Sequence, residues 1–79
     1  MDKADLIELF GWSESEWLDK TAGSAIRRIG YERWLRNIAI ALGNAPKSKA
    51  VVNALKSRLE SESELVREHV HWALLQHET

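Results

Sequence analysis

The residues of this chain that are best suited to chemistry are four arginines, Arg27, Arg28, Arg33 and Arg36, which are followed by Asn37. Each guanidinium carries a planar fork of donors that matches the oxygens of a phosphate group. Arg33 and Arg36 are three residues apart, so on a helix they project side by side. Asn37 adds a neutral donor and acceptor. The group is therefore predicted to bind an anion.

The positive charge of the chain is concentrated in its middle. Residues 1–23 carry six acids and two lysines, residues 24–58 carry eight basic residues and one acid, and residues 59–79 carry five acids and one arginine. The three net charges are −4, +7 and −4, so the overall charge of −1 conceals a basic middle. Such a segment favours an anionic partner, with RNA as a leading one, and binding through four arginines would depend strongly on salt.

Other interpretations of these arginines stay open. They can form a solvated helix face, or clamp onto Glu32 and the acidic ends of the chain. They can also dock against another domain of a larger protein. Lys49, Lys56 and Arg58 are expected on the exposed side of their helix. Together with Lys47 they either extend the basic surface through non-specific phosphate contacts or are ordinary surface residues.

The sequence does not support catalysis or metal binding. His69 and His71 point to different faces of a helix, and His69 and His77 are two turns apart, roughly 12 Å along the axis. Helical metal pairs are instead spaced by three or four residues. The chain has no cysteine, so no thiolate can hold an iron–sulfur cluster. We predict no catalytic residue, no metal ligand and no cofactor in this chain.

Four tryptophans are many for 79 residues, and aromatic rings can stack on unpaired bases of RNA. Trp17 and Trp34 fall on apolar stripes and are predicted to be core residues. Trp12 follows a helix-ending glycine and is expected to staple the start of the second helix. Trp72 lies off the main stripe of its helix and is the best candidate for partial exposure, although packing is its expected role.

The elements that position these residues are predicted to be helical throughout, which gives an all-α fold of about five short helices. No alternation of period two is present, and one proline and four glycines interrupt the pattern. The first predicted helix runs from Asp2 to Phe10 and is ended by Gly11, and the second begins with a Ser13–Glu16 capping box and ends near 21–23. A third segment runs from Ser24 to Ile29, and the central helix runs from Tyr31 to Leu42 and is ended by Gly43 and Asn44. The last two helices run from Pro46 to about Leu59 and from Glu64 to His77, the latter capped by Ser63. The expected core stripes are Leu6, Leu9 and Phe10; Tyr31, Trp34, Leu35, Ile38 and Leu42; Val51, Ala54, Leu55 and Leu59; and Val66, Val70, Ala73, Leu74 and His77.

At this length the chain is expected to form one domain, with N-terminal helices in 1–30 and HEAT-like helices in 31–79. An antiparallel pair with a short polar turn, followed by Ala73 and Leu74, is typical of a HEAT-type repeat. No apolar run approaches the roughly 18 residues that span a bilayer, and residues 1–10 do not read as a signal peptide. We expect a cytoplasmic domain without a membrane partner, cut from a larger protein, in which Met1 is added or internal.

Over nearly its whole length the chain resembles the C-terminal part of epoxyqueuosine reductases. The segments that carry the resemblance are GWSESEWLDKTAG, TAGSAIRRIG, RWLRN, ALGNAP and SELVREHVHWAL. Enzymes of this family complete queuosine synthesis on tRNA by reducing an epoxide with cobalamin and iron–sulfur clusters. Their chemistry lies in an N-terminal domain and a cysteine-rich, ferredoxin-like domain, neither of which this chain contains.

The resemblance implies a non-catalytic accessory domain of an oxidoreductase. It would bind the anticodon stem-loop of tRNA through Arg27, Arg28, Arg33, Arg36 and Asn37, while the catalytic domains of the parent enzyme carry out the reduction. The expected mechanism is electrostatic capture and orientation of the tRNA. The alternative is a HEAT-type scaffold that docks to other proteins or domains without direct contact to RNA.

Overall fold

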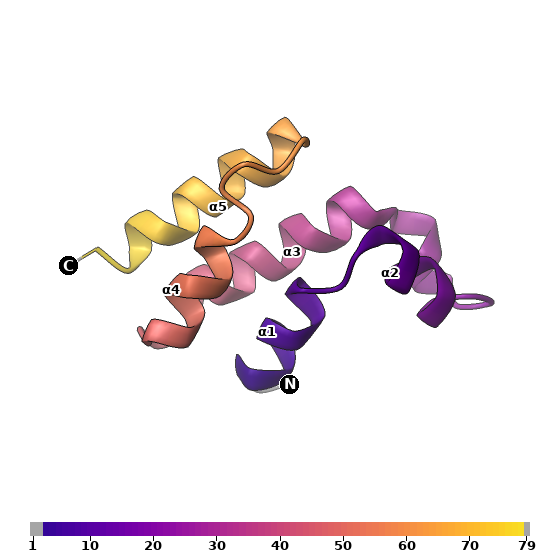
Figure 1. Cartoon of the computed structure of the whole chain (residues 1–79), viewed down its shortest axis with the longest axis horizontal. Helices are drawn as coiled ribbons and strands as arrows, with labels where there is room; N and C mark the ends of the chain where they lie inside the picture. The colour runs from indigo at the N-terminus through magenta and orange to yellow at the C-terminus, as the bar shows by residue number, and fades with distance from the viewer. Residues whose placement is uncertain (1–2, 79) are drawn as a thin grey trace.

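The computed structural model describes residues 3–78, which form five α-helices and one short 3₁₀ helix with no strand among them (Figure 1). The elements are α1 (Lys3–Phe10), α2 (Glu14–Lys20), η1 (Ala25–Ile29), α3 (Tyr31–Asn44), α4 (Lys49–Lys56) and α5 (Glu64–Gln76). The all-α prediction is confirmed, and HEAT-type packing stays a prediction. The expected helix start at Asp2 lies outside the described residues.

Serine side chains cap the starts of the helices at the positions that the sequence predicts. The Ser13 hydroxyl accepts from the Glu16 amide at 3.2 Å, and the Glu16 carboxylate accepts from the Ser13 amide at 3.1 Å, which completes a capping box. Ser24 accepts from the amide of Ile26, and Ser63 accepts from that of Val66, each at 3.2 Å. These contacts satisfy amides that have no partner within the helix.

Helix α4 is shorter at both ends than expected. It begins at Lys49 because the Ser48 hydroxyl accepts from the Val51 amide at 3.1 Å, so Pro46 precedes the cap instead of occupying the first turn. It ends at Lys56, where the Ser57 hydroxyl donates to the Ala54 carbonyl oxygen at 2.6 Å. Hydrogen-bonded turns continue the chain to residue 61.

Gly43 does not end α3, contrary to the prediction. The helix continues through Asn44, and Gly43 is buried against α5. A Cβ atom at this position would lie 2.6 Å from Cζ3 of Trp72 and 3.0 Å from Cα of Ala73. The glycine therefore permits the close approach of two helices instead of terminating one.

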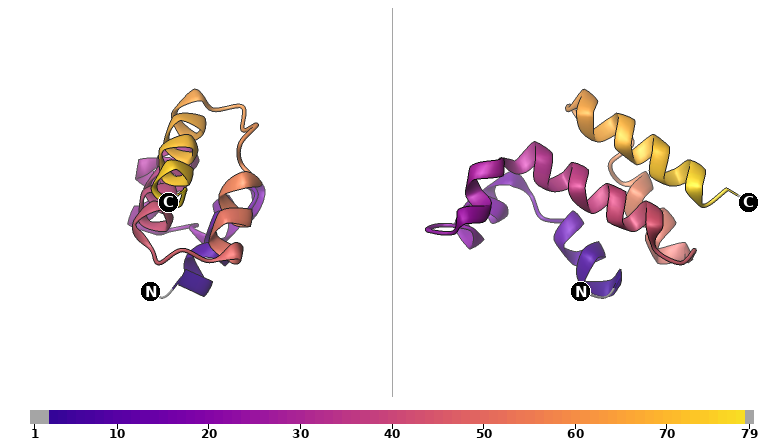
Figure 2. Two further views of the ribbon diagram at one scale, coloured as in Figure 1. Left: turned by 90° about the vertical axis from the view of Figure 1, so that its left-hand side faces the viewer. Right: turned by 180° about the vertical axis from the view of Figure 1, so that it is seen from behind.

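Helices α3 and α5 lie side by side in the same direction and share the largest helix contact (Figures 1 and 2). At their starts the Ser63 hydroxyl donates to the Glu32 carboxylate. At their ends Nε2 of the buried His77 donates to the Leu42 carbonyl oxygen at 2.8 Å. The core between them and against α1 and α4 contains Phe10, Leu35, Ile38, Ala39, Leu42, Val51, Leu55, Val66, Val70 and Ala73. Most of the predicted apolar stripes lie in this core, with Tyr31, Trp34, Ala54, Leu59 and Leu74 partly buried beside it.

An aromatic cluster holds α2 against the start of α3. Trp12 stacks on Trp34 with ring centroids 5.9 Å apart and planes 13° apart, and Trp17 lies 5.9 Å from Tyr31. The Tyr31 hydroxyl donates to the Trp12 carbonyl oxygen. Trp17 is 2% exposed, which confirms its predicted core position. This cluster fixes the end of α3 from which the arginines project.

Candidate nucleic-acid interface

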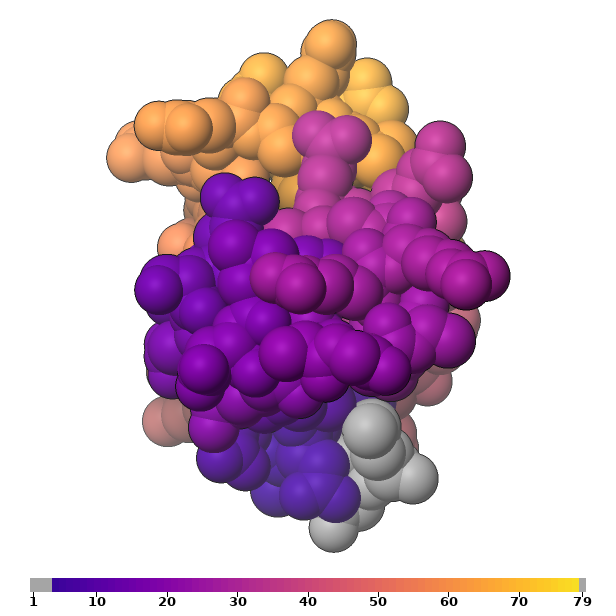
Figure 3. Space-filling view, turned by 90° about the vertical axis from the view of Figure 1, so that its right-hand side faces the viewer, coloured from indigo at the N-terminus to yellow at the C-terminus, as the bar shows by residue number. Residues whose placement is uncertain are grey.

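The predicted arginines lie where η1 meets α3. Arg27 and Arg28 are exposed on η1, and Arg33 is exposed on the first turns of α3. Gly23 and Gly30 flank η1 with φ of 76° and 86°, values that glycine adopts at little cost. Figure 3 looks onto this end of the molecule, where η1 and the start of α3 lie at the surface. We call Arg27, Arg28, Arg33 and Arg36 the arginine group.

Arg36 is half-buried and is held by its neighbour. Its Nε and Nη2 donate to Oδ1 of Asn37 at 3.2 and 3.0 Å. The amide oxygen of Asn37 is therefore engaged with the guanidinium, which restricts the orientation of Arg36. Asn37 supports this arginine, and its amide nitrogen is the part that remains as a donor.

Within residues 3–78, no member of the arginine group has a carboxylate oxygen within 4.0 Å. Glu32, the one acid in the basic middle of the sequence, accepts from the Ser63 hydroxyl. The clamp onto Glu32 that the sequence left open is absent from the structure. Four guanidinium groups without ion-pair partners produce a positive potential at this end of the molecule.

A cleft of about 920 Å³ borders the arginine group, between the η1–α3 junction and the turn that joins α4 to α5. Arg33 and Tyr31 form part of one wall. The acids that line the cleft are Glu14, Glu32, Glu60 and Glu62. Arg33 and Arg58 also line the cleft, so its four acids leave a net charge of −2. A polyanion is therefore attracted to the arginine group more than to the cleft beside it.

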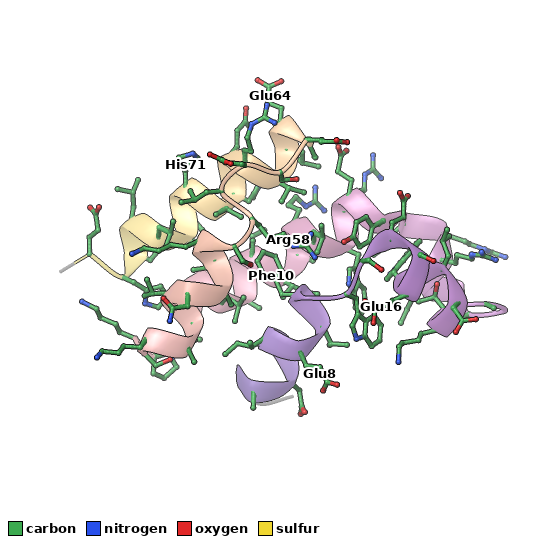
Figure 4. All side chains as sticks on the ribbon, in the orientation of Figure 1. Glu8, Phe10, Glu16, Arg58, Glu64 and His71 are labelled. Atoms are coloured by element: carbon green, nitrogen blue, oxygen red, sulfur yellow. The ribbon has the colours of Figure 1, made fainter. Side chains whose placement is uncertain are left out.

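Arg58 is not part of the exposed basic surface, which corrects the sequence prediction. Its Nε and Nη2 donate to the Phe10 carbonyl oxygen at 3.1 and 2.8 Å, and Nη2 also donates to the Trp12 carbonyl oxygen at 2.9 Å. The guanidinium lies 5.7 Å from the Phe10 ring centroid, and Figure 4 shows the two side chains together. Arg58 thus satisfies carbonyl groups at the end of α1, where helical partners are lacking.

The lysines do not extend the arginine group. Lys49 and Lys56 are exposed, as predicted, and Lys47 is exposed just before α4. However, Lys47 follows the far end of α3, whereas η1 precedes its start. The 14 residues of α3 place η1 about 21 Å from the end of the helix, and Arg36, the nearest member of the arginine group, lies about 12 Å along the axis from that end. The lysines line their own groove of about 510 Å³ with Val52 and Asn53.

A shallow hollow of about 410 Å³ lies between α3 and α5 and is lined by Ile40, Glu68, His69 and Trp72. Trp72, the tryptophan singled out as the best candidate for partial exposure, is 38% exposed, and it also packs against Gly43 as its expected role required. The sequence reading did not single out Ile40 or Glu68. The signal in the sequence that could have identified Ile40 is its position, four residues after Arg36 and off the core stripe of α3.

Among residues 3–78 no cluster of three or more histidine, cysteine or acidic side chains is arranged to hold a metal ion. No helix in the same range has the length and apolar character needed to cross a membrane.

Comparison with known proteins decides the family. An epoxyqueuosine reductase from Pseudomonas aeruginosa is 61% identical over 77 residues, which cover 98% of this chain and 21% of that protein. The relative from Xanthomonas campestris is also 61% identical, over 98% of the chain and 22% of the protein, and that from Escherichia coli is 58% identical over 91% and 19%. The chain belongs to the epoxyqueuosine reductase family.

The match to epoxyqueuosine reductases falls on their C-terminal part, and the chain spans about a fifth of the length of these relatives. The resemblance identified in the sequence is thereby confirmed. No protein-family model and no solved structure matches the chain.

Proposed function

We propose that the chain is a tRNA-binding accessory part of an epoxyqueuosine reductase, an oxidoreductase that acts in queuosine synthesis on tRNA. The observation that carries the proposal is the arginine group, whose four guanidinium groups extend from η1 to the middle of α3 without a carboxylate partner in the described residues. The iron–sulfur chemistry of the family is assigned to other parts of the parent, since this sequence contains no cysteine, and the cobalamin is assigned there as the resemblance implies.

In this proposal the chain captures and orients RNA through its phosphates. Arg33 and Arg36 are separated by about 4.5 Å along the axis of α3, so both can face one run of backbone. Asn37 holds Arg36 in place, which lowers the entropy lost when a phosphate binds. The acidic cleft beside Arg33 keeps the backbone from crossing toward the α4–α5 turn. The proposed RNA element is the anticodon stem-loop, as the family resemblance implies.

The test is the Arg33→Ala/Arg36→Ala double variant. Fluorescence anisotropy would compare its affinity for a labelled stem-loop with a GUN anticodon and for a scrambled hairpin, over a range of salt. Loss of two phosphate contacts should weaken binding and flatten the slope of log K against log salt by about 1.4 to 1.8. Circular dichroism should show an unchanged helix content.

The matched control is Lys47→Ala/Lys49→Ala, which removes the same charge from the other end of α3. If both pairs reduce affinity equally, the arginines are not a defined site. If neither pair changes the affinity, or if the arginine variant unfolds, the proposal that this group binds RNA is wrong.

Docking of η1 to another part of the parent enzyme is a second candidate function, favoured by two exposed isoleucines. Ile26 is 45% exposed and Ile29 is 38% exposed. Residues three apart eclipse one another on a 3₁₀ helix, so the two side chains form one apolar strip. Absence of RNA binding by the unmodified chain at low salt would favour this function. Ile26→Ser/Ile29→Ser should then weaken its association with the rest of the parent.

A further inference from the structure

We propose that the hollow between α3 and α5 binds one unpaired nucleobase, stacked on the indole of Trp72. The inference rests on the proposed function, because it assigns a base subsite to the RNA whose phosphates contact the arginine group. The hollow holds about 410 Å³ and is lined by Ile40, Glu68, His69 and Trp72.

Trp72 has the surroundings that a stacking platform needs. The site of an added Cβ on Gly43 lies 2.6 Å from its Cζ3, so part of the indole is pressed against the backbone of α3. The residue is nevertheless 38% exposed, and it lines the hollow together with Ile40. A ring that is fixed on one side and open on the other can receive a base without losing much side-chain entropy.

The hollow continues the stripe of α3 that carries the arginines. Arg33, Arg36 and Ile40 follow each other at spacings of three and four residues, which places them along one helix face. Ile40 is therefore about 6 Å along the axis from Arg36 and about 10 Å from Arg33. At roughly 3.4 Å per stacked nucleotide, a strand bound at Arg36 reaches the hollow after about two nucleotides.

The polar edge of the hollow presents acceptors. Nδ1 of His69 lies 2.8 Å from the Leu65 carbonyl oxygen and donates to it, and in the tautomer with its hydrogen on Nδ1 the other ring nitrogen, Nε2, is an acceptor. The Glu68 carboxylate is a second acceptor, and its charge repels a phosphate. A base is favoured over the backbone at this place. The amino group of guanine, adenine or cytosine offers two N–H donors to these two acceptors, whereas uracil offers one N3–H, so the amino-bearing bases are favoured over uracil.

The experiment uses a hairpin RNA with 2-aminopurine at single positions of its loop. Stacking on Trp72 should quench the fluorescence of one of these positions on binding. Trp72→Leu keeps apolar bulk beside Gly43 but removes the aromatic face. It should abolish this quenching and weaken binding about five- to tenfold, with the salt slope unchanged because no phosphate contact is lost. Trp72→Phe should retain most of the quenching and most of the affinity. His71→Ala, which alters an exposed side chain of the same helix, should change neither the quenching nor the affinity.

A surface variant keeps the inference testable if Trp72→Leu fails to fold. Glu68→Gln removes the carboxylate from an exposed position and should reduce the preference for cytosine over uracil at the quenched position. The inference is wrong if a folded Trp72→Leu variant binds RNA as the unmodified chain does, or if quenching persists in it. An effect of Trp72→Leu on the full-length parent but not on RNA binding would assign the hollow to a protein segment instead. If the unmodified chain binds no RNA at low salt, it is the proposed function that fails.

Discussion

At the residue scale, the surroundings of each arginine decide what it does. Arg58 donates to the carbonyl oxygens of Phe10 and Trp12, which are more than 40 residues away in sequence. Arg33 is exposed and has no ion pair within residues 3–78. The same side chain therefore joins two helices in one place and presents an unpaired charge in another.

Replacement of Arg58 by lysine should destabilise the fold although the charge is kept. An ammonium group cannot reach both carbonyl oxygens with the fork geometry of a guanidinium, and the contact over the Phe10 ring is weakened. We expect the free energy of unfolding to fall by about 1 to 3 kcal/mol, measured by urea denaturation. Arg33→Lys is the matched control and should change it by less than about 0.5 kcal/mol. Equal effects of the two variants would show that the carbonyl contacts of Arg58 contribute nothing specific.

Glu16 takes part in a pH-sensitive contact at the start of α2. The Ser13 amide donates to its carboxylate at 3.1 Å, and this hydrogen bond is the main cause that lowers the pKa of Glu16 below its ordinary value. Desolvation opposes it, and the Ser13 hydroxyl and Lys20 add smaller lowering effects. Because the folded pKa is the lower one, the stabilisation is present above the unfolded pKa and is lost as the pH falls through the folded pKa. A carbon-detected NMR titration should show Glu16 ionising at lower pH in the folded chain than in urea. Identical titrations in the two states would contradict the capping box.

At the element scale, the contact between α3 and α5 depends on the absence of a side chain at Gly43. Gly43→Ala raises helix propensity by about 1 kcal/mol, but its Cβ would lie 3.0 Å from the Ala73 Cα, a backbone atom that cannot move alone. The clash should outweigh the gain, with a net loss of about 1 to 3 kcal/mol in thermal unfolding. Gly11→Ala is the control, since its nearest neighbours, the Glu8 and Ile7 carbonyl oxygens, lie at 3.4 and 3.7 Å. A more stable Gly43→Ala variant would contradict the close approach.

Helix interiors and serine caps could be predicted because both depend on residues close in sequence. The stripe through Leu35, Ile38 and Leu42 and the cap at Ser63 are of this kind. Gly43 was misread because a glycine that ends a helix and one that admits a neighbouring helix look alike in a sequence. The start of α4 was predicted at Pro46 and Ser48 was overlooked, although its hydroxyl can accept from the Val51 amide and so caps the helix.

The candidate site could be predicted only in part. The spacing of Arg33 and Arg36 on one helix face follows from the sequence alone. Their lack of a carboxylate partner does not, because it depends on where the fold brings Glu60 and Glu62. The role of Arg58 was hidden for the same reason, since its partners at the end of α1 are distant in sequence.

At the scale of the whole molecule, the charges are arranged along an elongated body with extents of 41 × 26 × 16 Å. The arginine group extends from η1 to the middle of α3, Lys47 and Lys49 follow the end of that helix, and the acid-lined cleft lies beside Arg33. The three charge blocks of the sequence therefore do not become three separate regions in space. An RNA at the arginine group feels both the attraction of the guanidinium groups and the repulsion of the cleft.

This arrangement predicts that removal of acids from the cleft tightens RNA binding. Glu60→Gln/Glu62→Gln deletes two negative charges from the cleft that Arg33 lines, so affinity for the stem-loop should rise about two- to fivefold at 0.1 M salt, where the Debye length is about 10 Å. The gain should disappear toward 1 M salt, where that length is about 3 Å. Glu8→Gln/Glu78→Gln makes the same charge change on α1 and after α5, and should have a smaller effect. If both pairs tighten binding equally, only net charge matters; if the cleft pair has no effect, the RNA does not lie at the arginine group.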